Sequence, residues 1–298
     1  MIVRDKPALR DVLLALNGSI LPKILGRLLV LGAISVGAVI LHRYFPEPMG
    51  HLSAMPFTLI GLALSIFMSF RNNACYDRWW EARKLWGQLI IASRSFARQT
   101  AVLAPDEREP LLSGVIGFAH GLAAKLRGSD EIAAIAPWVA EDGDAPAPNP
   151  TDAVLAAIGA QCARLTASAA ITPIHYSVLE AQLTELSHVQ GGCERIKSTP
   201  LPFAYSLLLH RTALLFCLLL PFALAPALGW WTPLLVLIVS YTFFGLDALG
   251  DELEDPFGTD DNDLPLAAMA RTVERELLHT LGRENLPPPL APIKSRLS

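Results

Sequence analysis

Phe57-Thr-Leu-Ile-Gly-Leu-Ala-Leu-Ser-Ile-Phe-Met-Ser-Phe70 is an uncharged apolar run that continues directly into Arg71-Asn-Asn-Ala-Cys-Tyr-Asp-Arg-Trp-Trp-Glu-Ala-Arg-Lys-Leu-Trp-Gly87. This change of composition predicts one helix that leaves a membrane and enters a cytosolic domain. Within it Gly61, Ser65 and Ser69 recur every four residues and share one face. Small residues on a face let neighbouring helices approach closely in lipid, so the stretch predicts a packed transmembrane helix.

One residue further along, Leu62, Ile66 and Phe70 form a second stripe on the same helix. Three large apolar side chains one turn apart would form a narrow hydrophobic constriction if several copies of the chain surrounded an axis. An apolar helix always offers such a triplet, so the spacing alone does not separate a pore lining from ordinary packing. The stripe gives the leading functional hypothesis, a hydrophobic pore neck.

The composition is that of an integral membrane protein. Of 298 residues, 52% are hydrophobic and 17% are charged, with a mean hydropathy of +0.39, whereas soluble domains carry about 25% charged residues. A membrane helix needs about 20 mostly apolar residues. The four predicted spans are Ile24–His42, Pro56–Phe70, Thr212–Gly229 and Trp230–Leu246.

The distribution of Lys and Arg sets the expected orientation, because cytoplasmic flanks carry the excess. The segment before the first span is rich in both, whereas the loop after that span has only Arg43. We therefore expect a multi-pass protein of the cell membrane, in a bacterium the inner membrane, with both termini in the cytoplasm. A net charge of −4 and a pI of about 6.0 give no basic surface for nucleic acid.

Between the two pairs of spans lies an insert with helical periodicity and almost no strand pattern. Its predicted helices are Leu85–Leu103, Leu111–Leu126, Ala153–Thr166 and Tyr176–Val189. The first 20 residues predict a short amphipathic cytosolic helix. The expected organisation is a cytosolic segment (1–23), two spans (24–70), a cytosolic helical domain (71–211), two further spans (212–246), an acidic cytosolic segment (247–285) and a Pro-rich tail (286–298) that either plugs the cytosolic opening or hangs free.

Three sequence patterns together resemble the bestrophin family, in the right order and over nearly the whole chain. They are Tyr76-Asp-Arg-Trp-Trp-Glu-Ala-Arg-Lys-Leu-Trp-Gly87, Gly191-Gly-Cys-Glu-Arg-Ile196 with Thr199-Pro-Leu-Pro-Phe-Ala-Tyr205, and Asp251-Glu-Leu-Glu-Asp-Pro-Phe-Gly-Thr-Asp-Asp-Asn-Asp-Leu-Pro265. The acidic Pro-Phe-Gly string is the most specific of them. The pattern is similar to the prokaryotic branch of the family.

This resemblance implies an all-α membrane protein with four transmembrane helices per subunit and a helical cytosolic domain. It implies a homopentamer in membrane lipid that conducts monovalent ions through one axial pore. The family's neck positions fall on Leu62, Ile66 and Phe70, in agreement with the stripe found from the residues alone. A second family constriction, the cytosolic aperture, aligns by distance onto Ile174.

The acidic string has two interpretations. In animal relatives the matching segment binds calcium, and here the candidate oxygen ligands are Asp260, Asp261, Asn262 and Asp263. The string is not an EF-hand loop, and Thr259 and Asn262 depart from the denser run of acids in animal relatives, which argues against calcium regulation. In the alternative, Glu254, Asp255 and the turn at Gly258 end the fourth span and bond to nearby backbone or arginines. No cofactor is expected to be required.

The charged string after the neck predicts ion pairs along one helix. Asp77 and Glu81 are expected to pair with the cations of this string, although these cations could instead line a vestibule. The cations are Arg71, Arg78, Arg83 and Lys84. The four cysteines are expected to be reduced structural thiols, because no C-x-x-C spacing occurs. The lone histidines His120, His175, His188 and His210 have no metal-ligand spacing and are expected to be structural.

Ion selectivity is the least determined property, because an apolar neck has no preference for the sign of the ion. The negative net charge and the resemblance to the prokaryotic branch favour sodium and other cations slightly over chloride. Two alternatives to a channel remain. One is a non-conducting membrane scaffold, and the other is a metal-dependent intramembrane transferase that would use Asp247, Asp251, Glu254 and Asp255.

Overall fold

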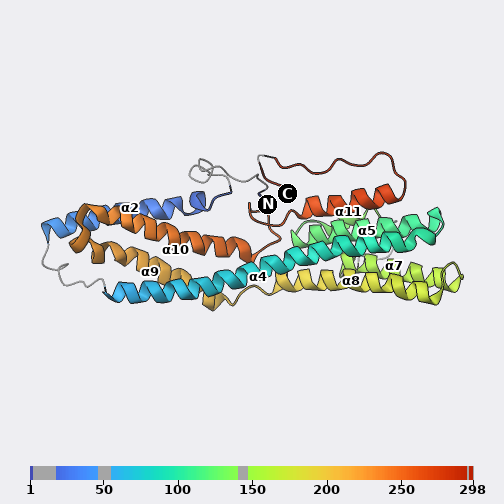
Figure 1. Cartoon of the computed structure of the whole chain (residues 1–298), viewed down its shortest axis with the longest axis horizontal. Coiled ribbons are helices and arrows are strands. Elements are labelled where there is room, and N and C mark those ends of the chain that lie inside the picture. Colours follow the sequence, from blue (N-terminus) through green and yellow to red (C-terminus); the bar gives the residue numbers. More distant parts are fainter. Residues whose placement is uncertain (3–17, 46–54, 140–146, 294, 298) are drawn as a thin grey trace. The chain divides into compact units, whose positions relative to one another are not determined.

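The computed structural model describes residues 1–2, 18–45, 55–139, 147–293 and 295–297, and within these ranges the regular structure is helical (Figure 1). The short helix expected in the first 20 residues falls mostly outside the described residues. The chain divides into two compact units. Residues 5–79 and 200–255 form one, here called the apolar unit, and residues 1–4, 80–199 and 256–298 form the other, here called the globular unit.

The apolar unit is built from α2 (Leu21–Tyr44), the first part of α4 (Met55–Gln99), α9 (Phe203–Leu228), η2 (Gly229–Trp231) and α10 (Thr232–Glu254). Helices α2, α9 and α10 pack against one another (Figure 1). The core of this unit is formed by large side chains such as Ile24 of α2, Met68 of α4 and Phe244 of α10. Within this unit, Arg71 in the interior of α4 lies beside the C-terminal part of α10.

Among the residues that the structure describes, three stretches are long and apolar enough to cross a membrane: Leu21–Tyr44, Met55–Val102 and Phe203–Glu254. The last stretch holds α9 and α10, joined by η2. Each of the four predicted spans lies within one of these stretches, and the number that cross the bilayer stays a prediction.

Helix α4 runs without a break from Met55 to Gln99 and contributes residues to both units. The prediction of one continuous helix through the apolar and charged strings is therefore confirmed. A short 3-10 helix, η1 (Thr100–Val102), follows it.

In the globular unit, α5 (Pro105–Leu126) is the central helix and packs against α6 (Glu131–Ile135), α7 (Pro150–Ala167) and α11 (Leu266–Thr280), while α7 also packs against α8 (Pro173–Ser198). Glycine in α5 permits close approach of its neighbours, as at Gly121, where a Cβ would lie 2.7 Å from Ile135 Cγ1. The four helices predicted for the insert are present, whereas α6 and α11 were not predicted.

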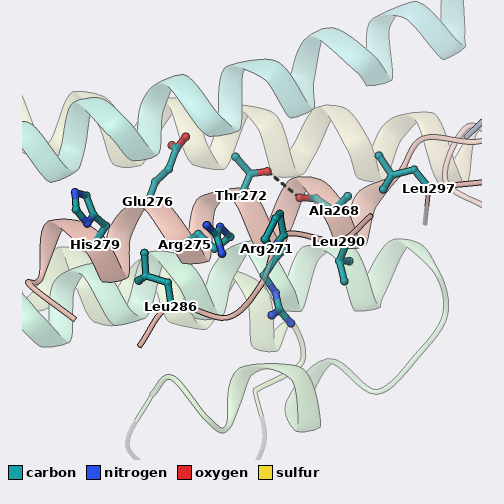
Figure 2. A pocket seen from close by; sticks show the side chains of 10 residues that line it. Ala268, Arg271, Thr272, Arg275, Glu276, His279, Leu286, Leu290 and Leu297 are labelled. Atoms are coloured by element: carbon teal, nitrogen blue, oxygen red, sulfur yellow. Dashed lines mark hydrogen bonds between the residues drawn. The ribbon is translucent and has the colours of Figure 1, made fainter. Parts of the chain in front are cut away.

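The Pro-rich end of the chain returns along α11 (Figure 2). The Arg275 guanidinium donates to the Pro287 carbonyl, and a cavity of about 470 Å³ lies between α11 and residues such as Leu286 and Leu290. Within the globular unit the tail is therefore packed on a helix; whether it plugs an opening stays untested.

Candidate functional site

The predicted neck residues lie on one face of α4. Leu62, Ile66 and Phe70 are 60%, 47% and 60% exposed in the single chain. The residues between them, Leu64 and Met68, are buried in the core of the apolar unit. Helix α4 thus packs one face against the rest of the apolar unit, and these three large apolar side chains are exposed in the single chain.

The stripe of small residues meets a neighbouring helix at one position. A Cβ on Gly61 would lie 3.1 Å from the Phe216 ring of α9, so glycine permits this approach. Ser65 bonds to the Gly61 carbonyl at 2.7 Å within its own helix, and Ser69 is exposed. The predicted close packing therefore occurs at Gly61, and the two serines stay on the open side of the helix.

Arg71, the residue directly after the neck, is completely buried and pairs with α10. Its Nη1 donates to Asp247 Oδ1 at 3.3 Å, and its Nη2 donates to Asp251 Oδ1 at 2.5 Å and to Glu254 Oε2 at 3.4 Å. The prediction of ion pairs along α4 is wrong for Arg71. A buried guanidinium needs several acceptors. Three acids of α10 provide them, whereas a single acid on α4 could not.

The prediction is also wrong for Glu81, which pairs with Arg195 of α8 within the globular unit. In both cases the partner comes from a helix distant in sequence. Residue spacing along α4 does not indicate which helices pack beside it, so these partners could not be predicted from it.

Two further side chains join the Arg71 cluster. His210 of α9 lies with Nδ1 2.7 Å from Asp247 Oδ2 and with Nε2 3.6 Å from Asp251 Oδ1. Arg27 of α2 lies 3.9 Å from Asp247 Oδ2. The cluster therefore ties together α2, α4, α9 and α10 at the end of the neck.

Backbone contacts hold the same region. Asn72 Nδ2 donates to the Leu246 carbonyl at 3.1 Å, and the Tyr205 hydroxyl donates to the Phe67 carbonyl at 3.0 Å. A Cβ on Gly250 would lie 2.6 Å from Asn72 Oδ1, so α10 approaches α4 here only because residue 250 is glycine. Contacts from α9 and α10 thus hold α4 in place at the polar end of the neck.

The acids at the end of α10 close the helix, as one of the two interpretations of this string predicted. Glu254 Oε1 accepts from the Leu201 backbone N–H at 3.0 Å, and its carbonyl accepts from Arg78 Nε at 3.2 Å. Asp247 and Asp251 are engaged by Arg71 and His210.

In the globular unit, Ile174 lies in the first turn of α8 and is 79% exposed. The turn is capped by Thr172, whose hydroxyl accepts from the His175 N–H, and the His175 ring lies 2.7 Å from the Gln99 carbonyl. An exposed apolar side chain on a capped helix start is compatible with an aperture, which stays a prediction.

The acidic loop after α10 belongs to the globular unit. Asp263 is buried and accepts from the Asp260 N–H at 2.6 Å, while Asp261 lies 3.5 Å from Arg296. Asn262 is half-buried beside them. Protein groups thus engage several of the predicted calcium ligands, and calcium binding stays untested.

The four cysteines are buried and free. For Cys193 in the globular unit, burial raises the pKa of the thiol to about 12. This agrees with the prediction of structural thiols. Sequence spacing did not reveal the partners of His210, because these partners lie 37 and 41 residues away on another helix.

The fold and the site define a helical membrane protein with an exposed apolar helix face that ends in a buried charged cluster. The chain matches the family described as "Bacterial/Fungal Bestrophin protein" over residues 1–279. It therefore belongs to the bestrophin family, whose members are channels and not enzymes.

Relatives support this assignment over the full length. The chain is 42% identical to a voltage-dependent anion channel-forming protein of Mesorhizobium japonicum, over 98% of this chain and 95% of the relative. It is 40% identical to the voltage-dependent anion channel-forming protein YneE of Salmonella typhi, over 99% and 98%. A solved bacterial bestrophin homolog from Klebsiella pneumoniae is 41% identical with a TM-score of 0.85, over 88% of this chain and 100% of that chain.

Proposed function

We propose that the chain conducts monovalent ions through a pore whose apolar neck is formed by Leu62, Ile66 and Phe70. The observation that carries the proposal is the exposure of these three side chains on a helix whose other face is packed within the chain. A contiguous exposed apolar surface marks contact with lipid, with another subunit or with a ligand path.

Five copies around one axis, the assembly that the bestrophin resemblance implies, place three rings of apolar side chains one turn apart. Apolar walls too narrow for favourable hydration hold water out, and a small widening admits a hydrated ion. The buried Arg71 cluster, one residue beyond the last ring, fixes the end of the neck against α10. Ile174 forms the cytosolic aperture in the same proposal.

The proposed topology follows the positive-inside rule. Four spans, 24–42, 56–70, 212–229 and 230–246, place both termini and the region 71–211 in the cytoplasm. The proposed location is the cell membrane, which the chain crosses several times.

The ion carried is proposed to be a monovalent cation such as sodium, on the basis of the net charge of −4 and the resemblance to prokaryotic bestrophins. Anion conduction is the second candidate, because the relatives carry the name voltage-dependent anion channel-forming protein. The neck has no charge with which to decide between them.

The experiment is a reversal-potential measurement on purified protein in planar bilayers under a sodium chloride gradient. A shift toward the sodium equilibrium potential supports the cation proposal, and a shift toward that of chloride supports the second candidate. Absence of current from a verified pentamer contradicts both and favours a non-conducting scaffold.

A further inference from the structure

The imidazole of His210 lies between two carboxylates of α10. Atoms of His210, Asp247 and Asp251 that could bind a metal all lie within 4.8 Å of one another. The three residues belong to the apolar unit and come from two helices that pack against each other, α9 and α10. Imidazole with carboxylate is a ligand set that Zn²⁺ and related transition-metal ions prefer.

The two ring nitrogens of His210 have different surroundings. Nδ1 lies 2.7 Å from Asp247 Oδ2, a distance for a hydrogen bond to a carboxylate that is 3% exposed. In metal sites a carboxylate in this position orients the ring and makes the opposite nitrogen a better ligand. With Nδ1 bonded to Asp247, Nε2 is the ring nitrogen whose lone pair is available to bind a metal ion.

Nε2 is directed toward a second carboxylate at a distance that suits a bridging ion. It lies 3.6 Å from Asp251 Oδ1, too far for a hydrogen bond. With Zn–N of about 2.0–2.1 Å and Zn–O of about 2.0–2.2 Å, two ligands of a tetrahedral zinc ion lie about 3.3–3.5 Å apart. An ion could join these two atoms with a shift of a few tenths of an ångström.

Access also favours an ion at this position. The side chains of His210 and Asp251 are 35% and 53% exposed in the single chain, so water can reach the space between them. The acids Asp247, Asp251 and Glu254 lie beside the guanidinium groups of Arg71 and Arg27, and Arg78 donates to the Glu254 carbonyl. A bound cation would therefore compete with Arg71 for Asp251.

We propose that His210 Nε2 and Asp251 form a binding site for a divalent transition-metal ion of the zinc type, with Asp247 orienting the imidazole and water completing the coordination. Binding draws Asp251 Oδ1 away from Arg71 Nη2, which it meets at 2.5 Å. Because Arg71 follows Phe70, the ion also alters current through the neck; this last consequence rests on the proposed function.

The test is calorimetric titration of the purified, tag-free protein in detergent with Zn²⁺ alone, using the intact oligomer. Wild type is expected to bind one ion per chain. His210→Ala and Asp251→Asn are expected to lose this binding, and Asp247→Asn to weaken it by about 10–100-fold, as other orienting carboxylates do. His188→Ala, which changes an exposed histidine of α8, is expected to bind as wild type does.

Several results overturn the proposal: no binding by wild type, undiminished binding by His210→Ala, or equal loss in His188→Ala. If gel filtration shows that His210→Ala does not fold, the Zn²⁺ titration of Asp251→Asn replaces it as the test. This variant is expected to fold, because its amide oxygen can still accept from Arg71. X-ray absorption of the zinc-loaded wild type is a second measurement, and a spectrum without a histidine ligand contradicts the site. Calorimetry needs no current, so a protein that binds Zn²⁺ without conducting contradicts only the proposed function.

Discussion

The two halves of α4 differ in what they expose and what they bury. From residue 55 to 79 many large apolar side chains are exposed, as at Leu62 and Phe70, and a charged residue, Arg71, is fully buried beside apolar ones such as Met68. From residue 80 to 99 the fully buried positions are apolar, as at Trp86 and Phe96, and charged residues face outward. One continuous helix therefore changes its inside-outside pattern within about two turns after the neck.

The difference indicates what surrounds each half. The second half has the arrangement of a soluble protein, in which water meets charge and the core is apolar. The first half has the arrangement of a surface that water does not cover freely, with its charge held inside by partners. Its exposed side chains need lipid, other subunits or a narrow pore, whereas those of the second half need only water.

Substituting one aromatic residue in each half tests this contrast most strongly. Trp86→Ala is expected to lower the free energy of unfolding by about 3–5 kcal/mol, because a fully buried ring leaves a cavity. Phe70→Ala is expected to change it by no more than about 0.5 kcal/mol, as at an exposed position. Thermal unfolding of both purified variants in the same detergent is the measurement. Equal losses of stability in the two variants would contradict this contrast, because Phe70 would then behave as a core residue.

The buried charge of the first half gives the next largest effect. Arg71→Met is expected to cost about 3 kcal/mol, because Asp247 stays buried while His210 and Arg27 compensate it only in part. Arg98→Met removes an exposed arginine from the second half of the same helix and is the matched control, expected within about 0.5 kcal/mol of wild type. Chemical unfolding of both variants measures the difference. A cost for Arg71→Met no larger than that of the control would show that the cluster does not stabilise the fold.

A smaller, pH-dependent effect is expected in the globular unit, at Glu194. Burial acts to raise the pKa of this carboxyl, but hydrogen bonds from Lys125, Gln190 and Asn149 outweigh it and leave the pKa lowered from 4.5. A carboxyl whose folded pKa is lowered stabilises the fold above its unfolded pKa, and this contribution disappears as the pH falls through the folded value.

Glu194→Gln should therefore be less stable than wild type at neutral pH, and the difference should shrink as the pH falls below about 4.5. Melting temperatures of the two proteins across that range are the measurement. A difference that stays constant on acidification would contradict the assigned role of the Glu194 charge. Glu185→Gln, which changes another glutamate of α8, is the control.

Periodicity was sufficient to predict the long helices, because apolar residues at helical spacing leave few other structures. It predicted α4 as one helix and the helices α5, α7 and α8, and it placed Leu62, Ile66 and Phe70 on one face. Helix α11 was missed although its signal was present. Its buried residues Leu266, Ala270, Val273 and Leu277 follow helical spacing, but the segment 247–285 was predicted only as an acidic cytosolic segment, without a helix.

The charged cluster could not be predicted from one sequence. Arg71 and Asp247 are 176 residues apart, and nothing along the chain links them. The nearest acid along α4, Asp77, is six residues from Arg71 and outside the spacing of a helical ion pair. Folding placed α10 beside α4 and gave Arg71 a buried position with several acceptors. Contacts between helices depend on packing of the whole unit, which residue spacing along one helix does not contain.

The neck is tested most directly by single-channel conductance of the triple variant Leu62→Ala, Ile66→Ala and Phe70→Ala beside wild type in planar bilayers, after gel filtration has verified the same assembly. The account predicts a larger conductance or open probability for the variant, because smaller side chains widen the constriction and let water enter it. A current identical to that of wild type would contradict the account, and the exposed face of α4 would then be a surface for lipid or for a neighbouring subunit.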